Sequence, residues 1–431
     1  MEDRVIREVE LLAIGAGPSS LGLAVAVEEL APDLADSTLV VDRAEEIQWQ
    51  QGMLLPWAKS QVSFLKDLVT PRDPCSRFSF LNFLRATGRL DEFVTMGTSL
   101  PYRLEISEYL RWVANGLTRV RTLLGNACVS VEPQRDRQQA VTGWLTRLAD
   151  GSAIASRYLV FGVGRDPHIP GVFRDLPADR VVHSTAYRQR IAQLPKGRRV
   201  RVALVGGSQS AAEMFRALRE DLPDSEIDWL IRSVALNSDE SSKFTNELYY
   251  PSFVDEFHAA EPGAREQILR EMRGTNYSCV TPPMLESIYA DLYLDRLHGR
   301  DGRRLITMVD VTAARETGGE VVLDLTDRRT GVDTRLRCDL VVLGTGFDSR
   351  MPKLVRGLAG SLGLDRISVT RQYRLDLDEP AACYLQGVNE DTHGIADSLL
   401  SVLARRAEEI TLDIIEHRAL MRRPATYTAA S

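Results

Sequence analysis

The chain has 431 residues, of which 44% are hydrophobic and 26% are charged, and its formal net charge is −7. This length predicts two or three lobes, and the composition is typical of a soluble enzyme. The acidic balance argues against a nucleic-acid partner, which needs a basic surface, and the apolar runs are too short to cross a membrane.

The predicted elements begin with a strand over residues 9–14. The residues before it lack the apolar segment of a signal peptide, so we expect a cytoplasmic protein. The strand leads into Gly15-Ala-Gly17-Pro18-Ser-Ser20 and then into a stretch with helical periodicity, which is the context of a dinucleotide-binding motif. Gly15 permits the tight turn, and Gly17 lets the backbone approach a pyrophosphate, whose charge is met by the helix N-terminus. Ser20 replaces the usual third glycine.

A second predicted strand covers residues 38–41 and ends at Asp42. An acidic side chain at this place can accept hydrogen bonds from both hydroxyls of an adenosine ribose. Taken alone, the glycine turn is compatible with the start of any helix. The strand before it, the helix after it and the acid that follows favour a nucleotide site.

A second glycine turn follows a predicted strand over residues 201–205. It reads Gly206-Gly207-Ser208-Gln209-Ser210-Ala211-Ala212-Glu213. Ser208 occupies the second glycine position, so its side chain must keep out of the path of the pyrophosphate. The next predicted strand, 227–231, leads to Arg232 and Ser233, a cation and a hydroxyl that suit the 2′-phosphate of NADPH. The alternative for Arg232 is a solvated charge at the end of a strand.

Two further strand-and-glycine segments, 158–164 and 339–347, resemble the paired crossover segments of flavoproteins that bind two dinucleotides. The resemblance implies that the first glycine turn holds FAD and the second holds NADPH. It also implies an FAD-binding domain in two parts, 1–190 and 338–431, around an NADPH-binding domain over 191–337.

Cysteine and histidine patterns narrow the class of enzyme. The five cysteines are scattered without a C-x-x-C pair, which argues against a disulfide reductase. The six histidines lack the spacing of metal ligands, so we expect no metal site. Fingerprints of Baeyer–Villiger and sulfur monooxygenases are also missing from the sequence.

Segments along most of the chain resemble, in order, the flavin-dependent N-hydroxylating monooxygenases that act on L-ornithine or L-lysine. Besides the second glycine turn, these segments are residues 49–56, 61–74, 78–84, 244–247, 275–278 and 393–401. The resemblance implies an α/β fold with two Rossmann-like dinucleotide-binding domains, for FAD and NADPH, and a small, mainly helical substrate-binding region. It implies that residues 236–280 form a lid over the substrate, and that the protein self-associates as a dimer or tetramer.

The resemblance also implies roles at the substrate. Lys66 would pair with the substrate α-carboxylate, and Asn246 would hold the head group of the amino acid. Asn276 would contact both the reacting amine and the nicotinamide ribose, because an amide donates and accepts hydrogen bonds. Asp397 and Ser398 would close the head-group pocket. Without the surrounding segments, Lys66 would be an ordinary solvated lysine and the two asparagines ordinary turn residues.

The remaining implied roles concern the two cofactors. The residues expected at FAD are Gly15, Gly17, Pro18, Ser20, Asp42, Trp49, Met53, Trp57, Gln61 and the backbone of Ile395. The residues expected at NADPH are Gly206, Gly207, Ser208, Gln209, Ser210, Arg232 and Asn276. Asn276 and Gln61, which would lie beside the flavin ring, are the catalytic candidates.

The implied reaction is the NADPH- and O₂-dependent hydroxylation of L-ornithine to N5-hydroxyornithine through a C4a-hydroperoxyflavin, for a siderophore or a related natural product. The run Arg72-Asp-Pro resembles the ornithine enzymes more closely than the lysine enzymes. Gln50, Lys243 and Tyr250 depart from the family pattern, and the last two lie in the lid, where they bear on substrate length and head group. The alternatives are L-lysine, a diamine or another amino acid as substrate, and a regulatory flavoprotein without turnover.

Overall fold

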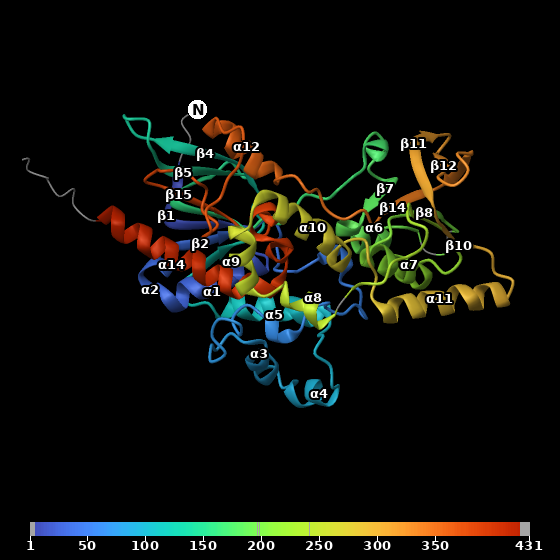
Figure 1. Cartoon of the computed structure of the whole chain (residues 1–431), viewed down its shortest axis with the longest axis horizontal. Coiled ribbons are helices and arrows are strands. Elements are labelled where there is room, and N and C mark those ends of the chain that lie inside the picture. The colour runs from blue at the N-terminus through green and yellow to red at the C-terminus, as the bar shows by residue number, and fades with distance from the viewer. Residues whose placement is uncertain (1–4, 196, 198, 241, 423–431) are drawn as a thin grey trace, which may run out of the picture.

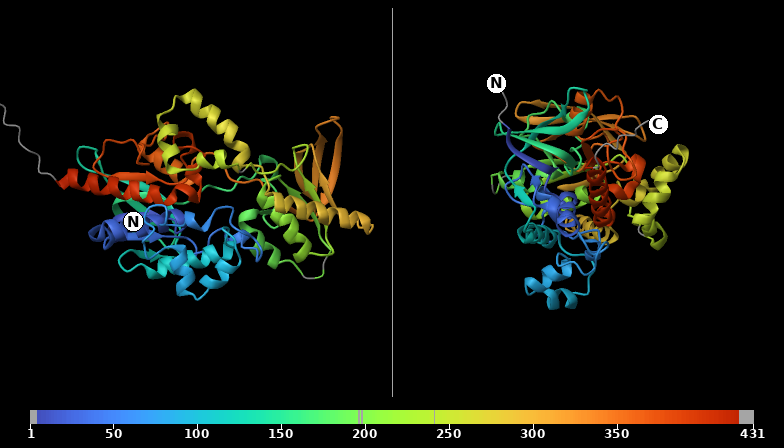
Figure 2. Two further views of the ribbon diagram at one scale, coloured as in Figure 1. Left: turned by 60° about the horizontal axis from the view of Figure 1, so that its bottom comes forward. Right: turned by 90° about the vertical axis from the view of Figure 1, so that its left-hand side faces the viewer.

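The computed structural model describes residues 5–195, 197, 199–240 and 242–422. Two lobes lie side by side along the longest axis of the molecule (Figure 1), and the left-hand view of Figure 2 shows the same division. None of the helices in these residues is both long and apolar enough to cross a membrane. The same part of the chain contains no group of three or more His, Cys, Asp or Glu side chains placed to hold a metal ion.

A mixed sheet forms the centre of the first lobe. Within the described residues it has seven strands, in the order β3-β2-β1-β6-β5-β4, with β15 also paired to β6. The strands are β1 Val5–Ile14, β2 Thr38–Val41, β3 Arg121–Leu123, β4 Cys128–Arg135, β5 Val141–Leu148, β6 Ala153–Phe161 and β15 Ala382–Leu385. β1 runs parallel to β2 and β6, with Ile14 opposite Val41 and Phe161. Leu385 also lies opposite Phe161, so four strands end at the edge where the first glycine turn begins.

A parallel sheet forms the centre of the second lobe, with a three-stranded antiparallel sheet beside it. The parallel sheet, in the order β10-β9-β8-β14-β7, consists of β7 Val181–His183, β8 Arg201–Val205, β9 Glu226–Leu230, β10 Arg303–Ile306 and β14 Leu340–Leu343. The antiparallel sheet consists of β11 Val309–Thr317, β12 Glu320–Asp327 and β13 Asp333–Cys338. Val205 lies opposite Leu230 and Leu343, so β8, β9 and β14 end together at the second glycine turn.

Two strands near the predicted domain boundaries belong to the sheet of the second lobe, so both boundaries differ from the prediction. β7 lies before residue 190 and β14 after residue 338, yet both pair within the second sheet. The second lobe therefore takes in one more strand at each end than predicted. The reason is that the crossover strand β14 forms its hydrogen bonds with β8, and the chain returns to the first lobe only after this strand.

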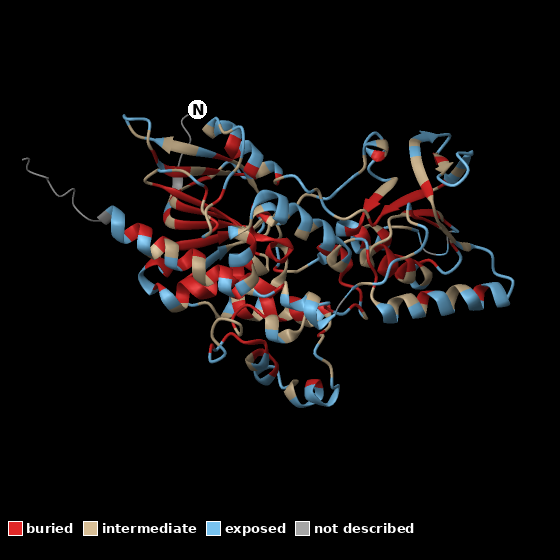
Figure 3. Ribbon diagram, viewed as in Figure 1, coloured by how far each residue is buried: buried red, intermediate tan, exposed pale blue. Residues whose placement is uncertain are grey.

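Helices cover both sheets. In the described residues they are α1 Pro18–Leu30, α2 Pro32–Ala35, α3 Phe80–Ala86, α4 Leu90–Thr95, α5 Arg103–Gly116, α6 Tyr187–Ala192, α7 Gln209–Asp221, α8 Lys243–Glu247, α9 Pro251–Ala259, α10 Pro262–Asn276, α11 Pro282–Leu297, α12 Lys353–Leu362, α13 Glu390–His393 and α14 Leu403–Arg422. Along β1, Leu11 and Ala13 face the core shared with α1 and α14, while Leu12 and Ile14 face the opposite core. Figure 3 shows the buried residues gathered in the strands and in the helix faces that cover them.

The predicted lid segment forms α8, α9 and α10. Although it lies between strands of the second lobe in sequence, it packs on the first lobe beside α13 (Figure 1). Phe257 of α9 packs against Gly394, and the rings of His258 and His393 lie 5.2 Å apart. Arg371 joins α9 to α14, because it pairs with Asp255 at 2.8 Å and with Glu409 at 2.8 Å.

Candidate active site

The first glycine turn lies between the end of β1 and the start of α1. Gly15 has a φ of +98°, which favours glycine, and a Cβ there would stand 2.5 Å from the carbonyl oxygen of Gly162. A Cβ on Gly17 would meet no atom of the described residues within 4 Å. In the same part of the chain, no side chain caps the N-terminus of α1. The backbone N–H groups at the start of α1 are therefore open to an anionic ligand such as a pyrophosphate.

The close packing that the third glycine usually allows is provided from another strand. Ser20 is fully buried, and a Cβ on Gly162 would lie 2.1 Å from the Ser20 hydroxyl oxygen. Gly162, which follows β6, is therefore the residue that lets α1 approach the sheet. This explains how the turn accommodates a serine at position 20.

The carboxylate of Asp42 holds the first turn against β2. Its Oδ2 accepts a hydrogen bond from the N–H of Ala16 at 2.5 Å, and its Oδ1 accepts one from the N–H of Ala44 at 2.7 Å. Each carboxylate oxygen can accept a further hydrogen bond, so the predicted contact with a ribose remains open to it. Ribose binding by Asp42 stays a prediction.

The second glycine turn repeats this arrangement in the second lobe. Gly206 has a φ of +125°, and a Cβ there would lie 2.2 Å from the carbonyl oxygen of Gly344. Ser208 donates a hydrogen bond from its hydroxyl to the same carbonyl at 3.1 Å. The side chain of Ser208 is thus held against the neighbouring strand end. Ser210 is half-buried in the first turn of α7, and within the described residues no side chain caps this helix.

The end of β9 lies beside the second turn. A Cβ on Gly207 would lie 3.8 Å from the hydroxyl oxygen of Ser233, and this hydroxyl donates to the carbonyl of Ala235 at 2.8 Å. Arg232 is exposed. Binding of a 2′-phosphate by Arg232 stays a prediction.

A buried ion pair joins the two lobes behind the second turn. Arg103 at the start of α5 and Glu213 in α7 are only 5% and 1% exposed, and Arg103 donates to the two oxygens of Glu213 at 2.6 and 2.7 Å. Gln209 donates to Glu213 at 2.9 Å and accepts from the N–H of Thr281 at 2.9 Å. The side chain of Gln209 is therefore committed to protein contacts, which leaves its backbone N–H for a nucleotide. This network sets the position of α7 relative to the first lobe.

Three predicted neighbours of the flavin lie in the segment that crosses between the lobes. Trp49 packs against the core of the first lobe, whereas Met53 is buried in the core of the second lobe. Trp57 donates to Glu220 at 3.1 Å and lies 4.2 Å below the guanidinium of Arg216. The side chains of Met53 and Trp57 thus pack on the second lobe, Met53 in its apolar core and Trp57 against two charged residues of α7.

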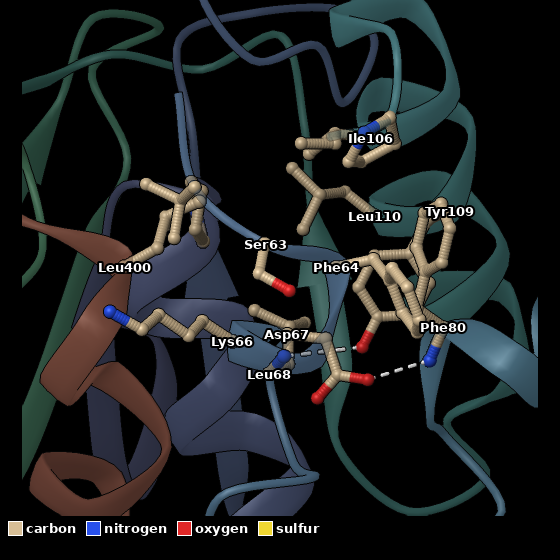
Figure 4. Close-up of a pocket in the computed structure, with 13 residues that line it drawn as sticks. Ser63, Phe64, Lys66, Asp67, Leu68, Phe80, Ile106, Tyr109, Leu110 and Leu400 are labelled. Atoms are coloured by element: carbon tan, nitrogen blue, oxygen red, sulfur yellow. Dashed lines mark hydrogen bonds between the residues drawn. The ribbon is translucent and has the colours of Figure 1, made fainter. Parts of the chain in front are cut away.

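Lys66 ends a short helical turn, Phe64–Lys66, and its ammonium donates to the hydroxyl of Ser401 at 3.1 Å. Burial lowers the pKa of Lys66, and a nearby anion would favour its charged form again. A cavity beside it encloses about 360 Å³ of space not filled by atoms, part of it open to solvent, and reaches Pro18 of the first turn. Figure 4 shows Lys66 extending toward Leu400, away from the rings of Phe80 and Tyr109. Ser401 lies in the matching segment 393–401, but its contact with Lys66 is not predictable from the sequence, because the two residues are 335 positions apart.

The buried carboxylate of Asp67 positions the segment that carries Lys66. It accepts hydrogen bonds from the N–H groups of Val69 at 2.9 Å and Thr70 at 2.6 Å, and from the N–H of Phe80 at 2.7 Å (Figure 4). Burial raises the pKa of Asp67, and these donors act in the opposite direction. Asp67 therefore ties the end of this turn to the start of α3.

Asp397 forms hydrogen bonds with two segments of the first lobe. It is fully buried, its Oδ1 accepts from Arg406 at 2.6 Å, and its Oδ2 accepts from the N–H of Asn389 at 2.7 Å. Arg406, only 1% exposed, also donates to the hydroxyl of Ser19 at 2.9 Å. The carboxylate of Asp397 thus braces α14 against the first glycine turn. The predicted role of Asp397 in closing the head-group pocket stays a prediction.

The other predicted substrate and catalytic residues lie on several different elements of the structure. Asn246 is exposed on α8, Gln61 is exposed, and Asn276 is half-buried at the end of α10. Ser398 donates to the carbonyl of Ile395 at 3.3 Å, and Ile395 is buried in the core beneath the lid. Among the described residues that line the cavity beside Lys66, none of these five is included. Their contacts with substrate and cofactors stay predictions.

Comparisons with known sequences identify the family. The family described as L-lysine 6-monooxygenase/L-ornithine 5-monooxygenase matches residues 7–349. The L-ornithine N(5)-monooxygenase of Pseudomonas aeruginosa is 36% identical over 418 residues, which cover 95% of this chain and 94% of the relative. The L-ornithine N(5)-monooxygenase of Burkholderia cepacia is 39% identical over 398 residues, 89% of each chain.

Solved structures agree with this result. Ornithine hydroxylase from Pseudomonas aeruginosa is 35% identical with a TM-score of 0.89, covering 95% of this chain and 100% of that chain. The ornithine N-hydroxylase of Kutzneria sp. 744, solved with reduced FAD, NADP⁺ and L-ornithine, is 31% identical with a TM-score of 0.86, covering 96% and 100%. The predicted α/β fold is confirmed. The chain belongs to the L-lysine 6-monooxygenase/L-ornithine 5-monooxygenase family.

Proposed function

We propose that this protein is an FAD- and NADPH-dependent monooxygenase that hydroxylates the side-chain amine of L-ornithine. The observation that carries the proposal is the position of Lys66, whose half-buried ammonium lies beside Ser401 at a cavity that reaches Pro18. A substrate carboxylate there would gain a charge partner close to the first glycine turn. The ornithine enzymes among the relatives support ornithine as the amino acid.

The two glycine turns supply the cofactor sites of this proposal. The open N–H groups at the start of α1 suit the pyrophosphate of FAD, and those at the start of α7 suit NADPH. The first lobe would then be an FAD-binding domain in two parts, and residues 236–280 a lid over the substrate. When bound, reduced flavin supplies the activation of O₂ that the reaction requires.

The residues of the chain act by binding and orientation. Lys66 would hold the carboxylate end of the amino acid, so that the side-chain amine at the other end points toward the flavin. The lid helices α8 and α10 carry Asn246 and Asn276 and would keep water out of the site. The amine must be uncharged to act as a nucleophile. If solvent removes its proton before the reaction, the site needs no side chain that acts as a general base.

Asn276→Ala should uncouple the reaction. If Asn276 aligns the amine, its loss misplaces the nucleophile, and a misplacement of about 1 Å can cost on the order of a hundredfold in rate. NADPH and O₂ would still be consumed, but hydrogen peroxide would replace the hydroxylamine. The measurement is the amount of hydroxylamine formed per NADPH consumed at saturating ornithine. A ratio equal to that of the wild type would make Asn276 a structural residue at the end of α10.

Arg232→Ala should weaken the preference for NADPH over NADH. Removing a charge-assisted contact with the 2′-phosphate costs on the order of 1.5–3 kcal/mol, which is roughly 10- to 150-fold in kcat/KM for NADPH. The value for NADH should stay unchanged, because NADH has no 2′-phosphate. The measurement is kcat/KM for NADPH and for NADH, from steady-state oxidation by the wild type and by Arg232→Ala. If the wild type already uses NADH and NADPH equally, Arg232 is a solvated charge.

A substrate screen tests the proposed amine. L-ornithine, L-lysine and putrescine are compared by the hydroxylamine that each yields per NADPH consumed, since oxidation of NADPH alone does not report hydroxylation. We expect the highest yield with ornithine. L-lysine and putrescine are included because Lys243 and Tyr250, in the lid, differ from the residues usual in the family. A higher yield with lysine or putrescine would overturn the choice of ornithine and leave the N-hydroxylase assignment in place.

The setting of the reaction is part of the same proposal. An N-hydroxylated ornithine is the kind of product that siderophore or related natural-product pathways consume, and we place this enzyme in one of them. A cytoplasmic location is supported by the five cysteines, which are all free thiols. Self-association as a dimer or tetramer completes the proposal.

A further inference from the structure

Helix α11, Pro282–Leu297, carries a row of large apolar side chains on its outer face. Tyr289, Tyr293, Leu294 and Leu297 are 69%, 54%, 45% and 64% exposed. Their spacing of three to four residues places them on one side of the helix. The helix lies along the outer edge of the second lobe, where Figures 1 and 3 show it away from the lid and the first lobe.

The opposite side of the same helix covers the core of the second lobe, and it also carries the buried Asp295, which pairs with Arg219 and Arg303. Ile288 is buried, and Met284, Leu285 and Leu292 pack against the core of the second lobe. A helix that covers one core normally carries polar residues on its other side, whereas a helix that is apolar all round is normally buried. α11 therefore packs one face on the core of the second lobe, while the apolar side chains of its outer face are exposed to solvent in the described structure.

Charged residues at the two ends of this outer face have opposite signs. Glu286 and Arg296 are exposed, and they stand ten residues apart, about 15 Å along the helix axis. They are too far apart to pair with each other. If a second α11 runs antiparallel across the first, Glu286 of one copy meets Arg296 of the other, twice. In the same arrangement Tyr289 of each copy meets Tyr293 of the other.

We propose that the outer face of α11 binds the same face of a second copy of this chain. The arrangement is self-complementary in charge and in aromatic contacts, as a two-fold interface requires. Two aromatic anchors framed by ion pairs are typical of the centre and rim of such an interface. The proposal concerns the assembly and is independent of the reaction, so its test does not depend on turnover.

The apolar contacts are tested by sedimentation or by light scattering after gel filtration, with the full-length protein loaded with FAD. Leu297→Asp should lower the mass from a dimer to a monomer, or from a tetramer to a dimer if a second interface exists. Leu412→Asp is the matched control, since Leu412 is 51% exposed on α14, and it should leave the mass unchanged. A wild type that is monomeric at every concentration, or a mass unaffected by Leu297→Asp, would overturn the proposal.

The charge pairing gives a sharper test. Glu286→Arg and Arg296→Glu should each weaken self-association, because each places like charges opposite one another. The double variant exchanges the two charges and should recover the wild-type mass. Thermal unfolding and flavin content of each variant verify that the fold is intact. If the double variant is no better associated than the two single variants, the antiparallel pairing of α11 is wrong.

Discussion

Replacing Lys66 by alanine should raise the apparent KM for L-ornithine strongly, while flavin content and the reduction of the flavin by NADPH stay near the wild-type values. Loss of a desolvated charge partner typically costs about 2–5 kcal/mol, which is roughly 30-fold to several thousandfold in affinity. The cause is that a carboxylate entering the cavity would lose the one lysine among the described residues that line it, with Ser401 left as a neutral donor. Steady-state kinetics with varied ornithine measure the effect.

Lys59→Ala is the matched control for this experiment. Lys59 is exposed, and its ammonium lies 5.4 Å from the ring centre of Tyr102 rather than at the cavity. It should therefore leave the KM for ornithine unchanged. If Lys66→Ala changes the KM no more than Lys59→Ala does, the carboxylate does not bind at Lys66.

The pH dependence of binding provides a second readout on Lys66. Because burial lowers the pKa of this ammonium, it loses its proton at a lower pH than an exposed lysine does. The affinity for ornithine should therefore be complete below that lowered pKa and fall as the pH rises through it. Lys66→Arg keeps its charge across this range, so its KM should depend less on pH. Deprotonation of the substrate amine affects both variants alike.

Arg103→Ala should reduce the free energy of unfolding by about 3–5 kcal/mol, because it leaves the buried carboxylate of Glu213 without its partner. The two side chains are almost fully buried between α5 and α7 and share two hydrogen bonds. Replacement of both residues by apolar ones, Arg103→Met with Glu213→Leu, should recover most of the loss, since no buried charge then remains. Denaturation by urea, followed by circular dichroism, measures these differences.

Arg111→Ala is the control from the same helix. Arg111 lies 3.8 Å from Glu46, and the two side chains are 46% and 67% exposed. An exposed pair of this kind contributes about 0–1 kcal/mol. If Arg103→Ala costs no more than Arg111→Ala, the buried pair does not hold the two lobes together.

The glycine turns were predictable because their signals are local. Gly15 and Gly206 adopt the positive φ that the motif requires, and Ser208 turns its side chain toward a neighbouring carbonyl as the prediction demanded. The packing glycines Gly162 and Gly344 stood in segments that the sequence singled out as crossovers. Their contacts with the two turns were not predictable, since they join residues that only the parallel sheets bring together.

The partners of the buried charged residues could not be predicted from the sequence. The motif that contains Asp397 does not show that Arg406 and the N–H of Asn389 donate to its two oxygens. Arg103 was overlooked because an arginine at the start of a helix gives no sign of a partner 110 residues later. Burial of an ion pair leaves no pattern in a single sequence, so such residues emerge only from the fold.

The most direct test of the proposed function is turnover of L-ornithine under isotopically labelled O₂, with the product analysed by fragmentation in a mass spectrometer. We expect one labelled oxygen atom on the side-chain nitrogen, formed in step with the oxidation of NADPH. Lys66→Ala at the same ornithine concentration should divert most of the label into hydrogen peroxide. Recovery of unchanged ornithine from the wild-type enzyme, with all of the label in hydrogen peroxide or water, would contradict the assignment of this site to ornithine N-hydroxylation.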